Sequence, residues 1–245
     1  MGRDTRTASC VLALTCASLY LALRSVRPAA RALKSLPALL FGAACARSRA
    51  EAAREGRRAS AVPLVFATYA VGDLIMECSE AAPAFLDVGA ACFACGHVAL
   101  ACWMMTAAGA GRLSRGRVRC AADVAYALLG CVAACAVALS ARSLSSALLV
   151  PYCLALALLC RASLARASGL LRRGGGESAR LRALATIFGT HALACSDAMI
   201  AAREMRDGSG GQSSERSQPR GAYEAAVMAL YWCALASMCF GMQPG

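Results

Sequence analysis

Long apolar runs recur along the whole chain, and this recurrence is the feature that most constrains its fold. The runs are about 16 to 24 residues long, which is enough for a helix that rises 1.5 Å per residue to cross a bilayer. Hydrophobic residues make up 59% of the chain and charged residues only 16%. A soluble domain or a disordered chain does not have this composition. The sequence therefore predicts an all-α protein, a polytopic transmembrane helical bundle.

Arginine-containing or turn-forming segments separate the apolar runs and divide one membrane domain, 1–245, into about eight predicted spans. The predicted spans are 8–23, 29–46, 61–77, 84–107, 118–140, 145–161, 182–203 and 222–243. Two connectors, 171–179 and 207–221, are rich in glycine and polar residues, which predicts flexible linkers.

Basic residues lie mostly in the short segments between the apolar runs. When the connectors are assigned alternately to the two sides of the membrane, the side with both termini has about twice as many basic residues. The positive-inside rule places that side, and both termini, in the cytoplasm. The net charge of +12 then reflects loops that face anionic lipid, so membrane lipid and not nucleic acid is the expected partner.

The 15 cysteines are scattered inside the apolar runs, where cysteine acts as a small hydrophobic residue. This distribution argues against a disulfide framework, which would place cysteines in loops. The spacing of Cys92, Cys95 and His97 does not bring three ligands to one helical face, and no second Cys/His group completes a tetrahedral zinc site. No metal ion or organic cofactor is predicted.

Of the four aspartates in predicted spans, Asp73 and Asp197 are the strongest functional candidates, because an ionisable side chain in hydrocarbon costs at least about 2.5–3.5 kcal/mol. Asp73 of the third span and Asp197 of the seventh lie roughly 6 Å and 9 Å from the non-cytoplasmic ends of their spans. Lys34 of the second span lies roughly 7 Å deep on the same side. Two carboxylates and an ammonium group therefore share one depth, and their cost in hydrocarbon predicts a functional site that contains Asp73 and Asp197.

The other polar residues of the spans differ in depth. Asp87 and Asp123 lie close to span ends and are interpreted as structural, because they can reach the interface. Glu77 is one helical turn from Asp73 on the same face and is an auxiliary candidate. Three residues nearer the midplane complete the set of candidates: His97, Tyr152 and Tyr231.

Short motifs occur in order along the chain at these same residues. They are Lys34-x-Leu36-Pro37, Tyr69-x-x-Gly72-Asp73, Phe85-x-x-x-Gly89-x-x-x-Phe93-x-x-x-His97, Tyr152 with Arg161-Ala162, Gly189 with Ser196-Asp197, and Tyr231. Over almost the entire chain, the ordered set resembles the YhhN-like lysoplasmalogenase family of eight-span membrane proteins. The chain departs from that family at Ser35, Leu100, His191 and near Leu235, where the family usually has proline, tyrosine, an apolar residue and glutamine.

The resemblance implies a hydrolase that cleaves the vinyl ether of lysoplasmalogen, a lysophospholipid, into a fatty aldehyde and glycerophosphoethanolamine or glycerophosphocholine. In this interpretation Asp73 and Asp197 are catalytic. The candidates for substrate binding or support are Lys34, His97, Tyr152, Ser196 and Tyr231. The expected location is the endoplasmic reticulum membrane in a eukaryote or the inner membrane in a bacterium, and the sequence leaves a homodimer open.

The two aspartates also suit this reaction on chemical grounds. Vinyl ethers hydrolyse by protonation at the β-carbon, which gives an oxocarbenium ion that water captures. The reaction needs a protonated acid and a carboxylate that stabilises the cation and activates water, and two carboxyl groups in one desolvated site can differ in protonation. Paired intramembrane carboxylates suit a proton-coupled transporter equally well, and a non-catalytic lipid-binding relative is a third alternative.

Overall fold

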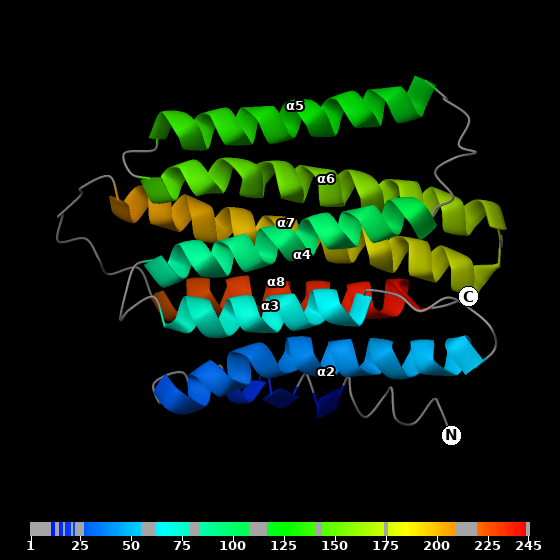
Figure 1. Cartoon of the computed structure of the whole chain (residues 1–245), viewed down its shortest axis with the longest axis horizontal. Helices are drawn as coiled ribbons and strands as arrows, with labels where there is room; N and C mark the ends of the chain where they lie inside the picture. Colours follow the sequence, from blue (N-terminus) through cyan, green and yellow to red (C-terminus); the bar gives the residue numbers. More distant parts are fainter. Residues whose placement is uncertain are drawn as a thin grey trace.

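Helices account for all the regular structure in the described part of the computed structural model (Figure 1). The structure describes residues 11–12, 15–16, 18–20, 22, 27–54, 62–78, 84–107, 117–140, 144–173, 176–208 and 220–243. The helices are α2 (Arg27–Arg54), α3 (Val62–Glu77), α4 (Ala84–Ala107), α5 (Arg117–Ser140), α6 (Leu144–Arg173), α7 (Glu177–Gly208) and α8 (Arg220–Gly241). Residues described between 11 and 22 are also helical. No strand occurs in these ranges, so the predicted all-α class is confirmed.

Four helices of the described chain are long and apolar enough to cross a membrane. The stretches concerned are Phe85–Ala107, Leu149–Arg173, Glu177–Arg203 and Ala222–Gly241, and a shorter apolar stretch is Ala121–Ala136. This length and composition are those of a helical membrane bundle. The eight-span topology and the cytoplasmic position of the termini stay predictions.

Three helices extend well beyond the apolar runs from which they were predicted, and one of them is α2, which reaches Arg54 although its predicted run ends at residue 46. α6 continues to Arg173 and α7 begins at Glu177, so the predicted flexible linker 171–179 is wrong at both of its ends. Leucine, alanine and arginine are good helix formers, and they carry the helices past the length that a bilayer requires. The backbone carbonyl of Gly176 accepts hydrogen bonds from the first turn of α7. Of the other predicted linker, 207–221, only the ends belong to α7 and α8, and residues 209–219 lie outside the described residues.

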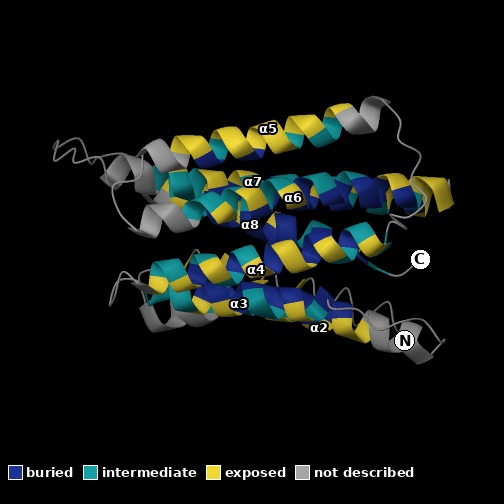
Figure 2. Ribbon diagram, turned by 45° about the horizontal axis from the view of Figure 1, so that its top comes forward, coloured by how far each residue is buried: buried dark blue, intermediate teal, exposed yellow. Residues whose placement is uncertain are grey.

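Six of the helices form a closed ring of neighbours. α2 packs on α3, α3 on α4, α4 on α6, α6 on α7, α7 on α8, and α8 returns to α2. α5 lies outside this ring and packs on α6, as Figure 1 shows. Figure 2 shows mostly exposed residues along the described part of α5, whereas α3 shows mainly buried and intermediate residues. The apolar residues that α5 exposes include Val124, Leu128, Leu129 and Val132, as expected for a face in contact with lipid.

Glycines let the helices that carry the two aspartates approach their neighbours closely. A Cβ atom added at Gly72 of α3 would lie 2.7 Å from the ring of Phe93 on α4. A Cβ atom added at Gly189 of α7 would lie 2.9 Å from the carbonyl oxygen of Ala234 on α8. Gly72 directly precedes Asp73, so the close contact of α3 with α4 helps to position this carboxyl group, while Gly189 brings α7, the helix that carries Asp197, against α8.

Candidate active site

A cluster of polar and aromatic side chains lies inside the ring, and every ring helix contributes to it. We refer to this set as the interior cluster: Lys34 from α2, Tyr69, Asp73 and Glu77 from α3, Phe93 and His97 from α4, Tyr152 from α6, Asp197 from α7, and Tyr231 from α8. The described part of α5 contributes no member. The cluster therefore depends on closure of the ring and not on any single helix.

Asp73 is one of the two buried carboxyl groups of the interior cluster. The residue is 3% exposed, and its Oδ2 accepts a hydrogen bond from the hydroxyl of Tyr231 at 2.8 Å. The carboxyl group also lies within electrostatic range of Lys34, Glu77 and Asp197. Asp73 thus has a neutral donor in direct contact and charged groups close by.

Lys34 forms an ion pair with Glu77 at the less buried edge of the cluster. The distance between Lys34 Nζ and Glu77 Oε1 is 2.6 Å, and the side chains are 16% and 24% exposed. The sequence placed Lys34 at the depth of Asp73, but its direct partner is the auxiliary candidate Glu77, one turn further along α3. Lys34 and Glu77 are therefore a matched pair of charges beside the buried carboxyl group.

Asp197 has different partners from Asp73. Its Oδ2 accepts a hydrogen bond from the hydroxyl of Tyr152 at 2.7 Å and lies 3.4 Å from Nε2 of His97. The other imidazole nitrogen, Nδ1, lies 2.9 Å from the hydroxyl of Tyr69. Nε2 also lies 3.4 Å from the Tyr152 hydroxyl, so a neutral imidazole that accepts from Tyr69 at Nδ1 carries its proton on Nε2, beside the Tyr152 and Asp197 oxygens. His97 is fully buried and therefore holds one fixed orientation between the two groups.

Aromatic rings lie between the Asp73 side of the interior cluster and the Asp197 side. The ring of Phe93 stacks on Tyr69 with centroids 5.5 Å apart, and lies 6.3 Å from the rings of both His97 and Tyr231. The structure describes no hydrogen bond between Asp73 and Asp197. The predicted aspartate pair consequently shares one interior, with each carboxyl group held by its own tyrosine.

Two members of the interior cluster, Tyr69 and Phe93, were not among the predicted site residues, and the predicted residue Ser196 has its hydrogen-bond partner outside the cluster. Tyr69 is four residues before Asp73, a spacing that places both on one helical face, and Phe93 is four residues before His97. This spacing of four residues could have predicted that Tyr69 and Phe93 belong to the site. Ser196 donates to the carbonyl oxygen of Val227 at 3.2 Å and so joins α7 to α8, and its supporting role in the site stays a prediction.

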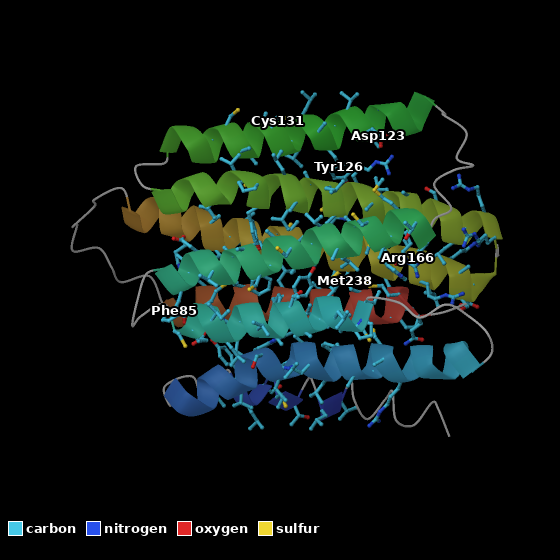
Figure 3. The ribbon with its side chains drawn as sticks, viewed as in Figure 1. Phe85, Asp123, Tyr126, Cys131, Arg166 and Met238 are labelled. Carbon is cyan, nitrogen blue, oxygen red and sulfur yellow. The ribbon has the colours of Figure 1, made fainter. Side chains whose placement is uncertain are left out.

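Polar pairs outside the cluster attach α5 to the ring. Asp123 of α5 accepts from Arg161 of α6 at 2.5 Å, and Tyr126 of α5 lies 2.6 Å from Nε2 of His191 on α7. Because Nδ1 of His191 lies 2.8 Å from the Ile187 carbonyl and must donate to it, Nε2 accepts from Tyr126. Figure 3 shows Asp123 and Tyr126 on the side of α5 that faces the ring.

The end of the bundle where α4, α6 and α8 meet has a third polar contact. Arg166 of α6, labelled in Figure 3, is buried. Its guanidinium lies 4.4 Å from the centre of the Trp103 ring on α4 and donates to the carbonyl oxygen of Gly241 on α8 at 3.2 Å. A cation at the C-terminus of a helix is favourable, so we interpret Arg166 as a structural residue.

No group of three or more His, Cys, Asp or Glu side chains that could hold a metal ion occurs among the described residues. The Cys92, Cys95 and His97 pattern diverges on α4, because His97 is fully buried while Cys95 is exposed. The interior cluster instead offers two carboxyl groups, an imidazole, phenolic hydroxyls and an ion pair. These groups can transfer protons, stabilise a cation and bind a zwitterion.

Fold and site together define a helical membrane protein with a buried acid–base cluster inside a ring of helices. The model of the YhhN family matches residues 29–242, and the chain belongs to this family. The match covers every member of the interior cluster and confirms the family resemblance that the sequence motifs predict. The family indicates a membrane protein of the hydrolase type. A search of curated proteins and a search of solved structures each found no match.

Proposed function

We propose that the protein is a membrane lysoplasmalogenase, which hydrolyses the vinyl ether bond of a lysoplasmalogen. The observation that carries the proposal is the placement of two carboxyl groups, Asp73 and Asp197, inside one ring of helices, each held by a tyrosine hydroxyl. Family membership supports the hydrolase class. The chemistry of a vinyl ether supports the choice of substrate, because its hydrolysis needs an acid and a carboxylate but no metal ion and no nucleophilic serine.

The proposed reaction begins with transfer of a proton to the β-carbon of the vinyl ether. The double bond supplies the electron pair, and the carbon attached to oxygen becomes an oxocarbenium ion. Water adds to that carbon and loses a proton, which gives a hemiacetal. The hemiacetal then collapses with cleavage of its bond to the glycerol oxygen. The products are a fatty aldehyde and a glycerophosphodiester, and one water molecule is consumed.

The surroundings of the two aspartates suggest a division of roles. Asp197 Oδ2 accepts a hydrogen bond from the Tyr152 hydroxyl and lies 3.4 Å from Nε2 of His97, so an imidazole that can exchange a proton is close to this carboxyl group. We therefore assign to Asp197 the roles of stabilising the cation and activating water. Asp73 has one direct donor, Tyr231, and the ammonium group nearest to it is already paired with Glu77. We assign to Asp73 the role of general acid.

The experiment that tests this function is an assay of detergent-purified protein with alkenyl lysophosphoethanolamine in D₂O. We expect release of a fatty aldehyde that carries one deuterium on the carbon next to the carbonyl, because the proton is delivered to the β-carbon. The double variant Asp73→Asn/Asp197→Asn is the control and should release no aldehyde. Absence of aldehyde from folded, monodisperse wild-type protein between pH 5 and 8 would contradict the proposal. Solute transport, or lipid binding without turnover, would then support the transporter or the lipid-binding alternative.

A further inference from the structure

We propose that Glu77 and Lys34 together form a head-group site for zwitterionic lysophospholipids, and that Glu77 determines the preference for a head group with an amine. Lys34 would bind the phosphate, and Glu77 would bind the ammonium group of ethanolamine or the quaternary ammonium of choline. This inference rests on the proposed function, since it names the part of the same site that selects the substrate.

The first observation is a gradient of burial along one face of α3. Asp73 is 3% exposed, whereas the Glu77 side chain, one turn nearer the end of the helix, is 24% exposed. Lys34 reaches the same level from the first part of α2, with 16% of its side chain exposed. The ion pair therefore lies at the rim of the interior cluster, where a polar head group would remain when the apolar chain and the vinyl ether enter the membrane interior.

The second observation is the spacing between the rim and the carboxyl groups. Asp73 and Glu77 are four residues apart and share one helical face, which separates them by roughly 6 Å along the helix axis. In a lysoplasmalogen the three-carbon glycerol backbone separates the vinyl ether oxygen from the phosphate by a comparable length. A phosphate on Lys34 would thus place the vinyl ether at the level of Asp73.

The third observation is the balance of charge at the rim. Lys34 Nζ and Glu77 Oε1 are 2.6 Å apart, so the site presents a cation and an anion side by side with no net charge. A zwitterionic head group can exchange partners with this pair and leave every charge compensated. A phosphate monoester without an amine would bind Lys34 and leave the Glu77 carboxylate unpaired next to the negatively charged phosphate.

The test measures kcat and KM for three alkenyl substrates: lysophosphoethanolamine, lysophosphatidic acid and the uncharged alkenylglycerol. For Glu77→Gln we expect the KM of the phosphoethanolamine substrate to rise about tenfold with little change in kcat, and the KM of the phosphatidic acid substrate to fall or stay constant. For Lys34→Met we expect the KM of both phosphate-bearing substrates to rise. An equal change for all three substrates in Glu77→Gln, or no change for any of them, would overturn the head-group role.

A second measurement separates this inference from the proposed hydrolysis. A 1-O-alkyl lysophosphoethanolamine has no vinyl ether and is not cleaved, so its equilibrium binding reports the head-group site alone. Glu77→Gln should weaken its binding about tenfold relative to the alkyl lysophosphatidic acid, even in a preparation that releases no aldehyde. Equal binding of both alkyl lipids by wild type and variant would overturn the inference.

Two further variants keep the result interpretable. Glu77→Asp retains the carboxylate and should restore part of the amine preference, which guards against a Glu77→Gln protein that fails to fold. Asp123→Asn breaks a different inter-helical ion pair, between α5 and α6, and should bind and discriminate as wild type does. A loss of amine preference in Asp123→Asn as large as in Glu77→Gln would contradict the assignment to Glu77.

Discussion

The interior of the ring and the side that carries α5 both contain acid–base contacts between helices, but the contacts are built differently. On the α5 side, Asp123 meets Arg161 directly at 2.5 Å, and its side chain is 43% exposed. In the interior, Asp73 and Asp197 are buried and accept from tyrosine hydroxyls. A carboxylate paired with a guanidinium is held in one charge state. A carboxyl group held by phenols can gain or lose a proton, which is what catalysis requires.

The two histidines show the same contrast. His97 lies fully buried between the Tyr69 hydroxyl and the Asp197 carboxylate, so both of its nitrogens belong to the interior cluster. His191 uses one nitrogen on the Ile187 carbonyl of its own helix and the other on Tyr126. His191 therefore joins α5 to α7 through Tyr126, and we propose that His97 orients Asp197.

The largest effect is expected from replacing either interior aspartate. Asp73→Asn and Asp197→Asn should each lower kcat/KM by about 10²–10⁴. The pH profiles should differ, because only Asp73 supplies a proton. The residual rate of Asp73→Asn should rise about tenfold per unit fall in pH, as hydronium ion replaces the lost acid. Steady-state aldehyde release between pH 5 and 8 measures this, and identical profiles for the two variants would contradict the division of roles.

Removal of the tyrosine hydroxyls should have a smaller effect. Tyr152→Phe deletes a hydrogen bond to the Asp197 carboxylate, and a bond to a charged group is worth about 1.5–3 kcal/mol, so we expect kcat/KM to fall by about 10- to 100-fold. Tyr231→Phe deletes a bond to the protonated Asp73, which is worth about 0.5–1.5 kcal/mol, so we expect a fall of about 3- to 10-fold. Tyr126→Phe removes a comparable hydroxyl on the α5 side and should retain activity. Equal losses in all three variants would show that the hydroxyls act through stability alone.

Glycine packing offers a third comparison, because each region has a glycine against a neighbouring helix. A Cβ atom would lie 2.7 Å from Phe93 at Gly72 and 2.9 Å from the Cβ of Ala157 at Gly130. Gly72→Ala and Gly130→Ala should each destabilise the protein by about 1–3 kcal/mol, measured by thermal unfolding in detergent. Only Gly72→Ala should also lower the activity of the folded fraction, since it displaces the ring next to the carboxyl groups. A matching loss in Gly130→Ala would remove the distinction between the regions.

The smallest functional effect is expected from a disulfide that tests closure of the ring. Cys45 of α2 and Cys239 of α8 are buried with their sulfur atoms 3.4 Å apart. Diamide oxidises two thiols to a disulfide, so we expect it to join these cysteines within one chain, with little change in activity. Mass spectrometry of peptides detects the link, and Cys45→Ser is the control. Failure to form it in folded protein would contradict the contact between α2 and α8.

Hydropathy was sufficient to predict the helices but not their order in space. The apolar run 84–107 has the same bounds as α4, because a run bounded by turn residues leaves little choice of ends. α6 and α7 were predicted too short, since an apolar run measures the thickness of a bilayer and helices can continue into water. The hydropathy of the apolar runs could not predict that α4 packs on α6 and that α5 lies outside the ring.

The same limit explains the site. The cost of an ionisable group in hydrocarbon identified Asp73 and Asp197, and their depth placed them together. Depth gives only the position of a residue along the membrane normal. It could not predict that Lys34 pairs with Glu77 or that His97 lies beside Asp197. Those partners depend on which helices are neighbours in the ring and on their rotation. Side-chain periodicity on α3 would have added Tyr69, which shares a face with Asp73.

The most direct test of the contrast between the two regions is aldehyde release by two double variants measured side by side. One is Asp73→Asn/Asp197→Asn in the ring interior, and the other is Asp123→Asn/His191→Ala on the α5 side. Both should be purified to the same folded, monodisperse state. We expect no aldehyde above background from the interior variant and a wild-type kcat per folded molecule from the α5 variant. Full turnover by the interior variant would contradict the proposed active site.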